Sequence, residues 1–343
     1  MSSILEIFEG KCYLDYAATR PLSEMIMDRF VKYSKEFPFN LSALYSGLDL
    51  KEIKGDILEA LNLPKSGYRV VVTSSASEAL SQAIVGTYMR RCSYSNQIVT
   101  TRLEHKSVLK AFDYLESIGA EIIYADCDQY GRADLKVLKD IFRNNKVLLF
   151  CSTHVNNESG VVNPVEQIGN LCSEFDVVSI IDTTQSIGKT PFDYSTVNCF
   201  CVSSHKLGGI NGVGLLVEKG EESAPLIYGT QQDGKRGGSL FAPSLLILRD
   251  LLRSSPIVSN LDVKSDYIFG RLNEKLSDWN HLIPENVRVP YIIPIETKHS
   301  KVEVMKILDD WIFSFGSSCN SSLEEKSHVY RQLSENEVFR LSL

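Results

Sequence analysis

The stretch RVVVTSSASEALSQAIVGTYMR, residues 69–90, shows the pattern that decides the fold. Its first residues are β-branched, as in a buried strand, and from residue 77 apolar residues recur at helical spacing. The same succession continues along the chain, with strands expected at 69–74, 97–101, 121–126, 146–153, 177–182, 198–204 and 213–219, and helices at 77–90, 106–119, 135–145 and 165–175. Strands that alternate with helices predict an α/β fold with a mostly parallel seven-stranded sheet and helices on both faces.

This alternation stops near residue 245. A helical pattern at 245–254 leads into a proline-punctuated region, and a further helix is expected at 301–315. We therefore expect a large domain at 15–245. A smaller α+β domain is expected from residues 1–14 together with 246–343.

The composition is that of a globular protein and excludes several classes. The chain has 343 residues, 43% of them hydrophobic, and a net charge of −7, which is unsuited to direct nucleic-acid binding. No run approaches the roughly 20 apolar residues that span a bilayer, and the N-terminus lacks a signal-peptide pattern, so no membrane association is expected. The eight cysteines include no CxxC pair. This spacing argues against a metal site and a disulfide framework, and it favours a reducing, cytoplasmic location.

Polar clusters directly follow five of the expected strands. They are Ser75–Glu78, Glu104–Lys106, His154–Asn157, Asp182–Gln185 and Ser203–Lys206. In an open parallel sheet, the ligand crevice lies at the carboxyl ends of the strands. We therefore expect these clusters to bind one polar molecule together.

Two of the clusters contain groups suited to a charged ligand. Ser75 and Glu78 form an S-x-x-E pattern at a helix start, where free N–H groups and Ser77 favour an anion such as phosphate. A plain helix cap is the alternative. Asp182 ends an apolar strand, so it needs a cation such as a protonated ring nitrogen, or it caps the helix that follows.

Three further residues carry reactive side chains. Lys206 follows a buried strand and precedes a glycine-rich segment, where a lysine either forms Schiff bases or is simply solvated. His105, at a strand-to-helix junction, is an acid/base group, a stacking platform or a helix cap. Cys319 lies in the polar stretch GSSCNSS, where a thiol is either a nucleophile or an incidental surface residue.

Taken together, these motifs resemble those of the cysteine desulfurases, pyridoxal-phosphate enzymes of the class-V aminotransferase family. The blocks that carry the resemblance are YLDYAATRP (13–21), TSSASEAL (73–80), LEHKSVL (103–109), HVNNESGVV (154–162), DTTQSIGK (182–189), SSHKLGG (203–209), KRGGS (235–239) and GSSCNSSLE (316–324). They occur in family order and span nearly the whole chain. The resemblance implies a pyridoxal-phosphate transferase fold, similar to aspartate aminotransferase, for the large domain.

The resemblance also implies how the cofactor, pyridoxal 5′-phosphate, is held. Lys206 would bind it covalently and later move the α-proton of the substrate. Asp182 would pair with the ring nitrogen, His105 would stack on the ring, and Gln185 would hydrogen-bond its phenolic oxygen. The phosphate would be bound by Ala76, Ser77, Ser203 and His205, and by Ser239 of the other subunit in a homodimer.

The reaction implied by the resemblance converts L-cysteine to L-alanine. Asn157 and Arg340 would hold the substrate carboxylate, with Asn40 as a further substrate contact. The Cys319 thiolate would take the sulfur as a persulfide and pass it to a sulfur-acceptor protein. Which acceptor this is, in iron–sulfur assembly, tRNA thiolation or DNA modification, is left open.

The sequence departs from the family pattern at four places, one of which is the RSGT segment, where Gly237 and Ser239 stand at the usual serine and threonine positions. The phosphate turn reads Ser75-Ala76-Ser77 instead of Gly-Ala-Thr, and Asn40-Leu41-Ser42 stands in place of an NPS-like segment. The sequence ends three residues after Arg340, so a trimmed small domain is expected. Two alternatives therefore stay open: a selenocysteine lyase-like enzyme, and a catalytically silent scaffold in a sulfur-transfer or DNA-modification complex.

Overall fold

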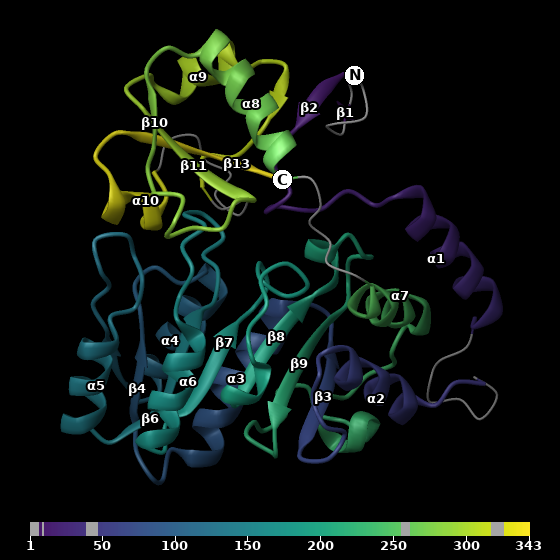
Figure 1. The fold of residues 1–343 in the computed structure, drawn as a ribbon. Coiled ribbons are helices and arrows are strands. Elements are labelled where there is room, and N and C mark those ends of the chain that lie inside the picture. The colour runs from purple at the N-terminus through teal and green to yellow at the C-terminus, as the bar shows by residue number, and fades with distance from the viewer. Residues whose placement is uncertain (1–6, 9, 39–46, 255–260, 317–325) are drawn as a thin grey trace.

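The computed structural model describes residues 7–8, 10–38, 47–254, 261–316 and 326–343. Its lower part in Figure 1 is built on a seven-stranded sheet, and its upper part contains two three-stranded sheets. The strands of the large sheet are β3 (Tyr68–Thr73), β4 (Gln97–Thr100), β5 (Glu121–Tyr124), β6 (Val147–Thr153), β7 (Val178–Asp182), β8 (Cys199–Ser203) and β9 (Gly214–Lys219).

The order of the large sheet is β3-β9-β8-β7-β6-β4-β5. All seven strands expected from the sequence are present, and the mostly parallel α/β fold is confirmed, since only β9 runs antiparallel to its neighbours. Strands β6, β7 and β8 are buried along their whole length, as expected where helices cover both faces. Because β7 and β8 are parallel neighbours, Asp182 and Ser203 come to the same edge of the sheet.

Helices cover the two faces of this sheet unequally. The helices of the lower part are α1 (Glu24–Glu36), α2 (Leu50–Ala60), α3 (Ala76–Arg91), α4 (Lys106–Ser117), α5 (Leu135–Asn144), α6 (Val165–Glu174) and α7 (Ala242–Arg253). Apolar side chains of α3 and α4 form one buried cluster, and those of α2, α5, α6 and α7 form the other. Helix α1 lies outside these layers and packs against α7, where Tyr33 donates a hydrogen bond to Asp250 (2.5 Å).

The upper part is assembled from both ends of the chain. Its elements are β1 (Ile7–Phe8), β2 (Lys11–Tyr13), α8 (Leu261–Lys275), β10 (Trp279–His281), β11 (Ile292–Thr297), α9 (Lys301–Ile307), β12 (Trp311–Ile312), α10 (His328–Leu333) and β13 (Glu337–Ser342). Leu14 shares an apolar cluster with Ile292 and Phe339. The domain division at residue 245 stays a prediction. Residue 245 itself lies inside α7, and Leu245 packs in the core of the large sheet.

The helix expected at 301–315 is wrong in its second half. Helix α9 ends at Ile307, and Trp311–Ile312 form β12, which pairs in parallel with β2. The run WIFSF is rich in aromatic and β-branched residues, which favour a strand once a partner strand is present. That partner is about 300 residues away in sequence, so the local pattern does not reveal it.

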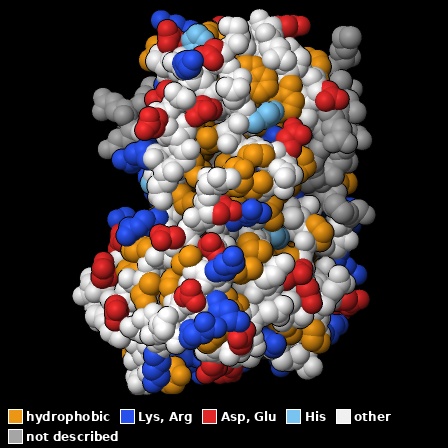
Figure 2. Space-filling model, turned by 60° about the vertical axis from the view of Figure 1, so that its left-hand side comes forward, with side chains coloured by type: hydrophobic (Ala, Val, Ile, Leu, Met, Phe, Trp, Pro, Cys, Tyr) orange, Lys and Arg blue, Asp and Glu red, His pale blue; other side chains and the backbone are white. Residues whose placement is uncertain are grey.

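The described surface is mixed in charge. Figure 2 shows Lys and Arg side chains interspersed with Asp and Glu over one face of both parts. Among the helices that the structure describes, none has the length and apolar character needed to cross a bilayer.

Candidate active site

A cavity of about 300 Å³ lies at the carboxyl ends of the strands, where the sheet faces the upper part. It is lined by Ala17, Ala18, Ser75, Ala76, Ser77, Leu80, His105, Ser107, Thr153, Val155, Asn157, Asp182, Thr184, Gln185, Ser203, His205, Lys206 and Arg340. All the site residues expected from the sequence are among them, except three. Of these three, Ser239 is exposed and does not line the cavity, whereas Asn40 and Cys319 lie outside the described residues.

Lys206 enters the cavity from the short 3-10 helix η2 (Ser204–Leu207), which directly follows β8. Its amine donates hydrogen bonds to the carbonyl oxygens of Ala17 (2.6 Å) and Ala18. These two carbonyls belong to the segment that precedes α1, so the lysine links the sheet edge to the N-terminal part of the chain. The alternative of a simply solvated lysine does not fit this arrangement.

Asp182 occupies the last position of β7 and is 6% exposed. Its Oδ1 accepts hydrogen bonds from the backbone N–H of Thr184 (2.9 Å) and from the Cys201 thiol (3.3 Å). The alternative that Asp182 caps a following helix is wrong, because residues 184–189 form turns and no helix, and the bond from Thr184 closes the first of them. A carboxylate at this depth is stabilised by a cationic or donor group in the cavity that it lines.

His105 is both a helix cap and a cavity residue, so the helix-cap interpretation is compatible with a role at a ligand. It is the N-cap of α4, and its Nδ1 accepts a hydrogen bond from the backbone N–H of Ser107 (3.1 Å). Burial lowers the pKa of His105, and the charge of Asp182 opposes this only in part. The ring is therefore held neutral, and because Nδ1 accepts the Ser107 N–H, the ring proton lies on Nε2, which is a hydrogen-bond donor.

The turn before α3 presents a helix N-terminus to the cavity. Ser75 caps the helix, since its Oγ accepts from the N–H of Glu78 (3.2 Å). The reciprocal half of the expected capping box is absent, because the Glu78 carboxylate accepts instead from the N–H of Ser74 (2.8 Å). Arg236 forms an ion pair with Glu78 (2.8 Å), so the carboxylate beside this anion-binding end is neutralised. No pattern in the sequence indicates this ion pair.

Ser203 and His205 precede Lys206 and lie at the same edge of the large sheet. Burial, together with the charges of Lys206 and Lys189, lowers the pKa of His205 to about 4. The neutral ring lies 3.2 Å from the Thr19 hydroxyl through Nδ1. His205 is therefore a neutral hydrogen-bonding group at pH 7.

Gln185 provides the sign that a ligand belongs in this cavity. Its Nε2 donates to the Ala17 carbonyl (2.8 Å), while its buried Oε1 has no hydrogen-bond partner among the described residues. Buried polar atoms are rarely left unsatisfied, so this oxygen marks a site for a bound group. The predicted bond to a phenolic oxygen needs an N–H donor, and Nε2 carries a second N–H besides the one that it donates to Ala17.

Arg340 comes from β13, at the opposite end of the chain, and is 1% exposed. Its Nη1 donates to the backbone carbonyl of Asn157 (2.6 Å), so these two predicted substrate contacts meet. Its Nη2 pairs with Asp15 (2.6 Å), which the sequence analysis did not single out.

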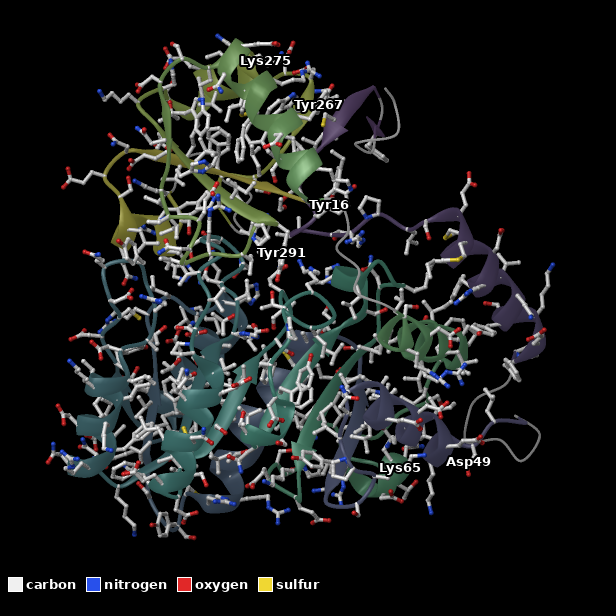
Figure 3. The ribbon with its side chains drawn as sticks, in the orientation of Figure 1. Tyr16, Asp49, Lys65, Tyr267, Lys275 and Tyr291 are labelled. Atoms are coloured by element: carbon white, nitrogen blue, oxygen red, sulfur yellow. The ribbon has the colours of Figure 1, made fainter. Side chains whose placement is uncertain are left out.

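Tyr291 is a second residue that no pattern in the sequence indicates. It lies between the upper part and the sheet (Figure 3), and its hydroxyl donates to the Gln185 carbonyl (3.0 Å). Lys189 lies over its ring at 5.4 Å.

Comparison with known proteins agrees with this geometry. The family model described as aminotransferase class-V matches residues 12–235. This chain belongs to the class-V aminotransferase family. The predicted family and fold are therefore confirmed, and the enzymes of this family depend on pyridoxal phosphate.

Curated relatives of this class-V aminotransferase are named as desulfurases. A protein of Dictyoglomus turgidum named cysteine desulfurase IscS is 29% identical over 334 residues, which cover 92% of this chain and 84% of the relative. Putative cysteine desulfurase IscS 1 of Bacillus subtilis is 28% identical, with 97% of this chain and 91% of the relative covered. A solved structure titled SspA in complex with cysteine has a TM-score of 0.83 and 27% identity, and covers 96% of this chain and 98% of that chain.

Proposed function

We propose that this protein is a pyridoxal-phosphate-dependent cysteine desulfurase that converts L-cysteine to L-alanine and transfers the sulfur to Cys319. One observation carries the proposal: Lys206, Asp182 and Arg340, from three distant segments, converge on one cavity in a class-V aminotransferase. The names of the curated relatives support the choice of reaction.

The residues present fit the cofactor. The N-terminus of α3, with Ala76 and Ser77, faces the cavity and suits a phosphate group, and Ser203 and His205 add polar groups on the same edge. The buried Asp182 carboxylate suits a protonated ring nitrogen, and the unpartnered Gln185 oxygen indicates a polar ligand beside it. When bound, pyridoxal phosphate withdraws electrons from the α-carbon of the substrate.

The protein's own groups then handle the substrate. Arg340 binds the α-carboxylate with the terminal N–H groups that its contacts to Asp15 and Asn157 leave over. Lys206 is the amine that holds the cofactor and moves the α-proton. When the substrate releases this amine, the carbonyls of Ala17 and Ala18 offer it hydrogen bonds, as they do in this structure. The neutral His105 carries its proton on Nε2, since Nδ1 accepts the Ser107 N–H, and it can donate a hydrogen bond to a group in the cavity that it lines.

Cys319 is the residue that receives the sulfur, and it lies outside the described residues. The Cys319 thiolate attacks the sulfur of the substrate, so an S–S bond forms while the C–S bond breaks. The electron pair of the C–S bond stays with the carbon and takes up a proton, which gives L-alanine. Cys319 is left as a persulfide, and no external oxidant is required.

The proposal extends to partners and location. Ser239 is exposed, which fits a contact with the active site of the second subunit in a homodimer. A sulfur-acceptor protein would take the persulfide from Cys319. The seven cysteines that the structure describes are all free thiols, which fits a reducing, cytoplasmic compartment.

The decisive experiment supplies purified protein with pyridoxal phosphate and L-cysteine, and measures L-alanine and protein-bound persulfide. We expect the two products in equal amounts in the first turnover, and no persulfide with Cys319→Ala. The matched control is Cys92→Ala, which removes an exposed cysteine at the far end of α3, about 24 Å from the cavity, and should change nothing.

Two results would overturn the proposal. Full sulfide release by Cys319→Ala would favour a lyase that needs no persulfide, and a protein that takes up no pyridoxal phosphate would favour a silent scaffold.

A further inference from the structure

Arg340 is a charged side chain in a place where charge is costly. Its side chain is 1% exposed, and its Nε has no hydrogen-bond partner among the described residues. A buried guanidinium is tolerated only when a counter-charge and hydrogen bonds replace the water that it has lost. The proposed substrate carboxylate supplies that charge only while substrate is bound, so a resident partner is required in the free enzyme.

Asp15 is that resident partner. It is 8% exposed, and its Oδ1 accepts from Arg340 Nη2 at 2.6 Å. Its Oδ2 accepts from the Ser314 hydroxyl at 2.5 Å. Ser314 also pairs with Arg340 through the backbone, since Arg340 N–H donates to its carbonyl at 2.7 Å. The carboxylate is thus oriented from one side by Ser314 while it holds the guanidinium on the other.

The guanidinium is fixed from two directions. Asp15 holds Nη2, and the Asn157 carbonyl holds Nη1 at 2.6 Å. Each terminal nitrogen carries two N–H groups, so one bond at each leaves one donor at each. Donors on both terminal nitrogens allow a guanidinium to bind both oxygens of a carboxylate. Arg340 lines the cavity, so this pair of donors is available to a ligand there.

We infer that Asp15 is a positioning residue, which holds the Arg340 guanidinium in the orientation that binds the α-carboxylate of the substrate. This inference rests on the proposed function. Asp15 begins the segment that carries Ala17 and Ala18, whose carbonyls bind Lys206. One short segment, residues 15–18, therefore contacts both the arginine that binds the substrate carboxylate and the amine of Lys206.

The test separates carboxylate recognition from general stability. Protein loaded with pyridoxal phosphate is titrated by calorimetry with L-alanine and with ethylamine, which is L-alanine without its carboxylate. Asp15→Asn keeps an oxygen for Arg340 but removes the charge. We expect it to bind L-alanine about tenfold more weakly and ethylamine as tightly as before, with a matching rise in KM for L-cysteine and a nearly unchanged kcat.

Two further variants keep the inference open to refutation. Ser314→Ala leaves the ion pair intact but removes the second hydrogen bond to Asp15, and should weaken L-alanine binding about threefold. It decides the question if circular dichroism shows that Asp15→Asn does not fold. Asp310→Asn is the control, because it removes a carboxylate from the Arg271 ion pair (2.8 Å), away from the cavity, and should leave both affinities unchanged.

The outcomes distinguish the inference from the proposed function. If the wild-type protein turns over L-cysteine but neither Asp15→Asn nor Ser314→Ala changes the ratio of the two affinities, the inference alone is overturned. If the wild-type protein makes no L-alanine from L-cysteine, the proposed function fails, and the inference fails with it.

Discussion

The two walls of the cavity are built in different ways. One wall consists of residues at the carboxyl ends of strands of the large sheet or within a few positions after them, among them His105, Asp182 and Lys206. We call it the strand-end wall. The other, the closing wall, consists of the segment 15–18 and Arg340, which meet although their contact spans 325 residues of sequence. We count Tyr291 with the closing wall, because it bonds Gln185 from a remote segment, although it does not line the cavity.

This difference separates two tasks. The strand-end wall is positioned by a sheet whose strands β6, β7 and β8 are buried along their whole length, and it carries the groups that face the cofactor in the proposed mechanism. The closing wall is held by single contacts between distant segments, such as the Asp15–Arg340 ion pair and the Tyr291–Gln185 hydrogen bond. We therefore expect substitutions in the strand-end wall to affect the chemical step most. Substitutions in the closing wall should affect the binding and positioning of the substrate.

The largest effect is expected for Lys206 in the strand-end wall. Lys206→Ala should lower kcat by at least about a thousandfold, because the amine that moves the α-proton is gone. Turnover of L-cysteine to L-alanine is the measurement. Lys206→Arg is the matched control: it keeps a cation for the Ala17 and Ala18 carbonyls but has no primary amine. Recovery of turnover in Lys206→Arg would mean that charge alone suffices.

The next effect concerns Glu104, which lies behind the strand-end wall at 1% exposure. Its carboxyl accepts hydrogen bonds from the Thr101 hydroxyl and the Thr153 N–H, both at 2.7 Å, yet burial raises its pKa to about 8. The folded protein therefore keeps a proton here between about pH 4.5 and 8, whereas the unfolded chain releases it. The stability tied to this proton is complete below that range and is lost as the pH rises towards 8.

Glu104→Gln tests this directly, because glutamine imitates the protonated acid. The free energy of unfolding of the wild type, relative to Glu104→Gln, should fall as pH rises from 5 to 8, by up to about 1.4 kcal/mol per pH unit. Urea denaturation at several pH values measures it. Glu116→Gln, on the exposed side of the neighbouring α4, should show no such trend. Parallel curves for the wild type and Glu104→Gln would refute the assignment.

The strand-end wall could be predicted from the sequence because each of its residues lies a few positions after a recognisable strand. The β-branched runs locate the strands, the parallel order brings their ends together, and the polar residues that follow must then share one edge. Ten of the expected residues line the cavity. One of them, Arg340, follows none of the strands that the hydrophobic pattern predicted. Arg340 was expected only from the family resemblance.

The closing wall could not be predicted in the same way. Asp15 and Tyr291 carry no local pattern, since their partners Arg340 and Gln185 are brought to them by pairing between remote strands. The same cause explains the wrong prediction of a helix over 301–315, because pairing with β2 makes residues 311–312 the strand β12. Contacts of high sequence separation are set by tertiary structure, which overrides local propensity.

The smallest effect is expected in the closing wall, at Tyr291. Its hydroxyl bonds the Gln185 carbonyl at 3.0 Å and Thr190 at 2.7 Å, so Tyr291→Phe removes two hydrogen bonds and keeps the ring beneath Lys189. We expect unfolding free energy to fall by about 1–2 kcal/mol and kcat/KM about threefold, since the Gln185 backbone loses its tether. Tyr33→Phe breaks a phenol contact to Asp250 on α7 and should lower stability alone. Equal kcat/KM in both variants would show that Tyr291 only stabilises the fold and does not help to position Gln185.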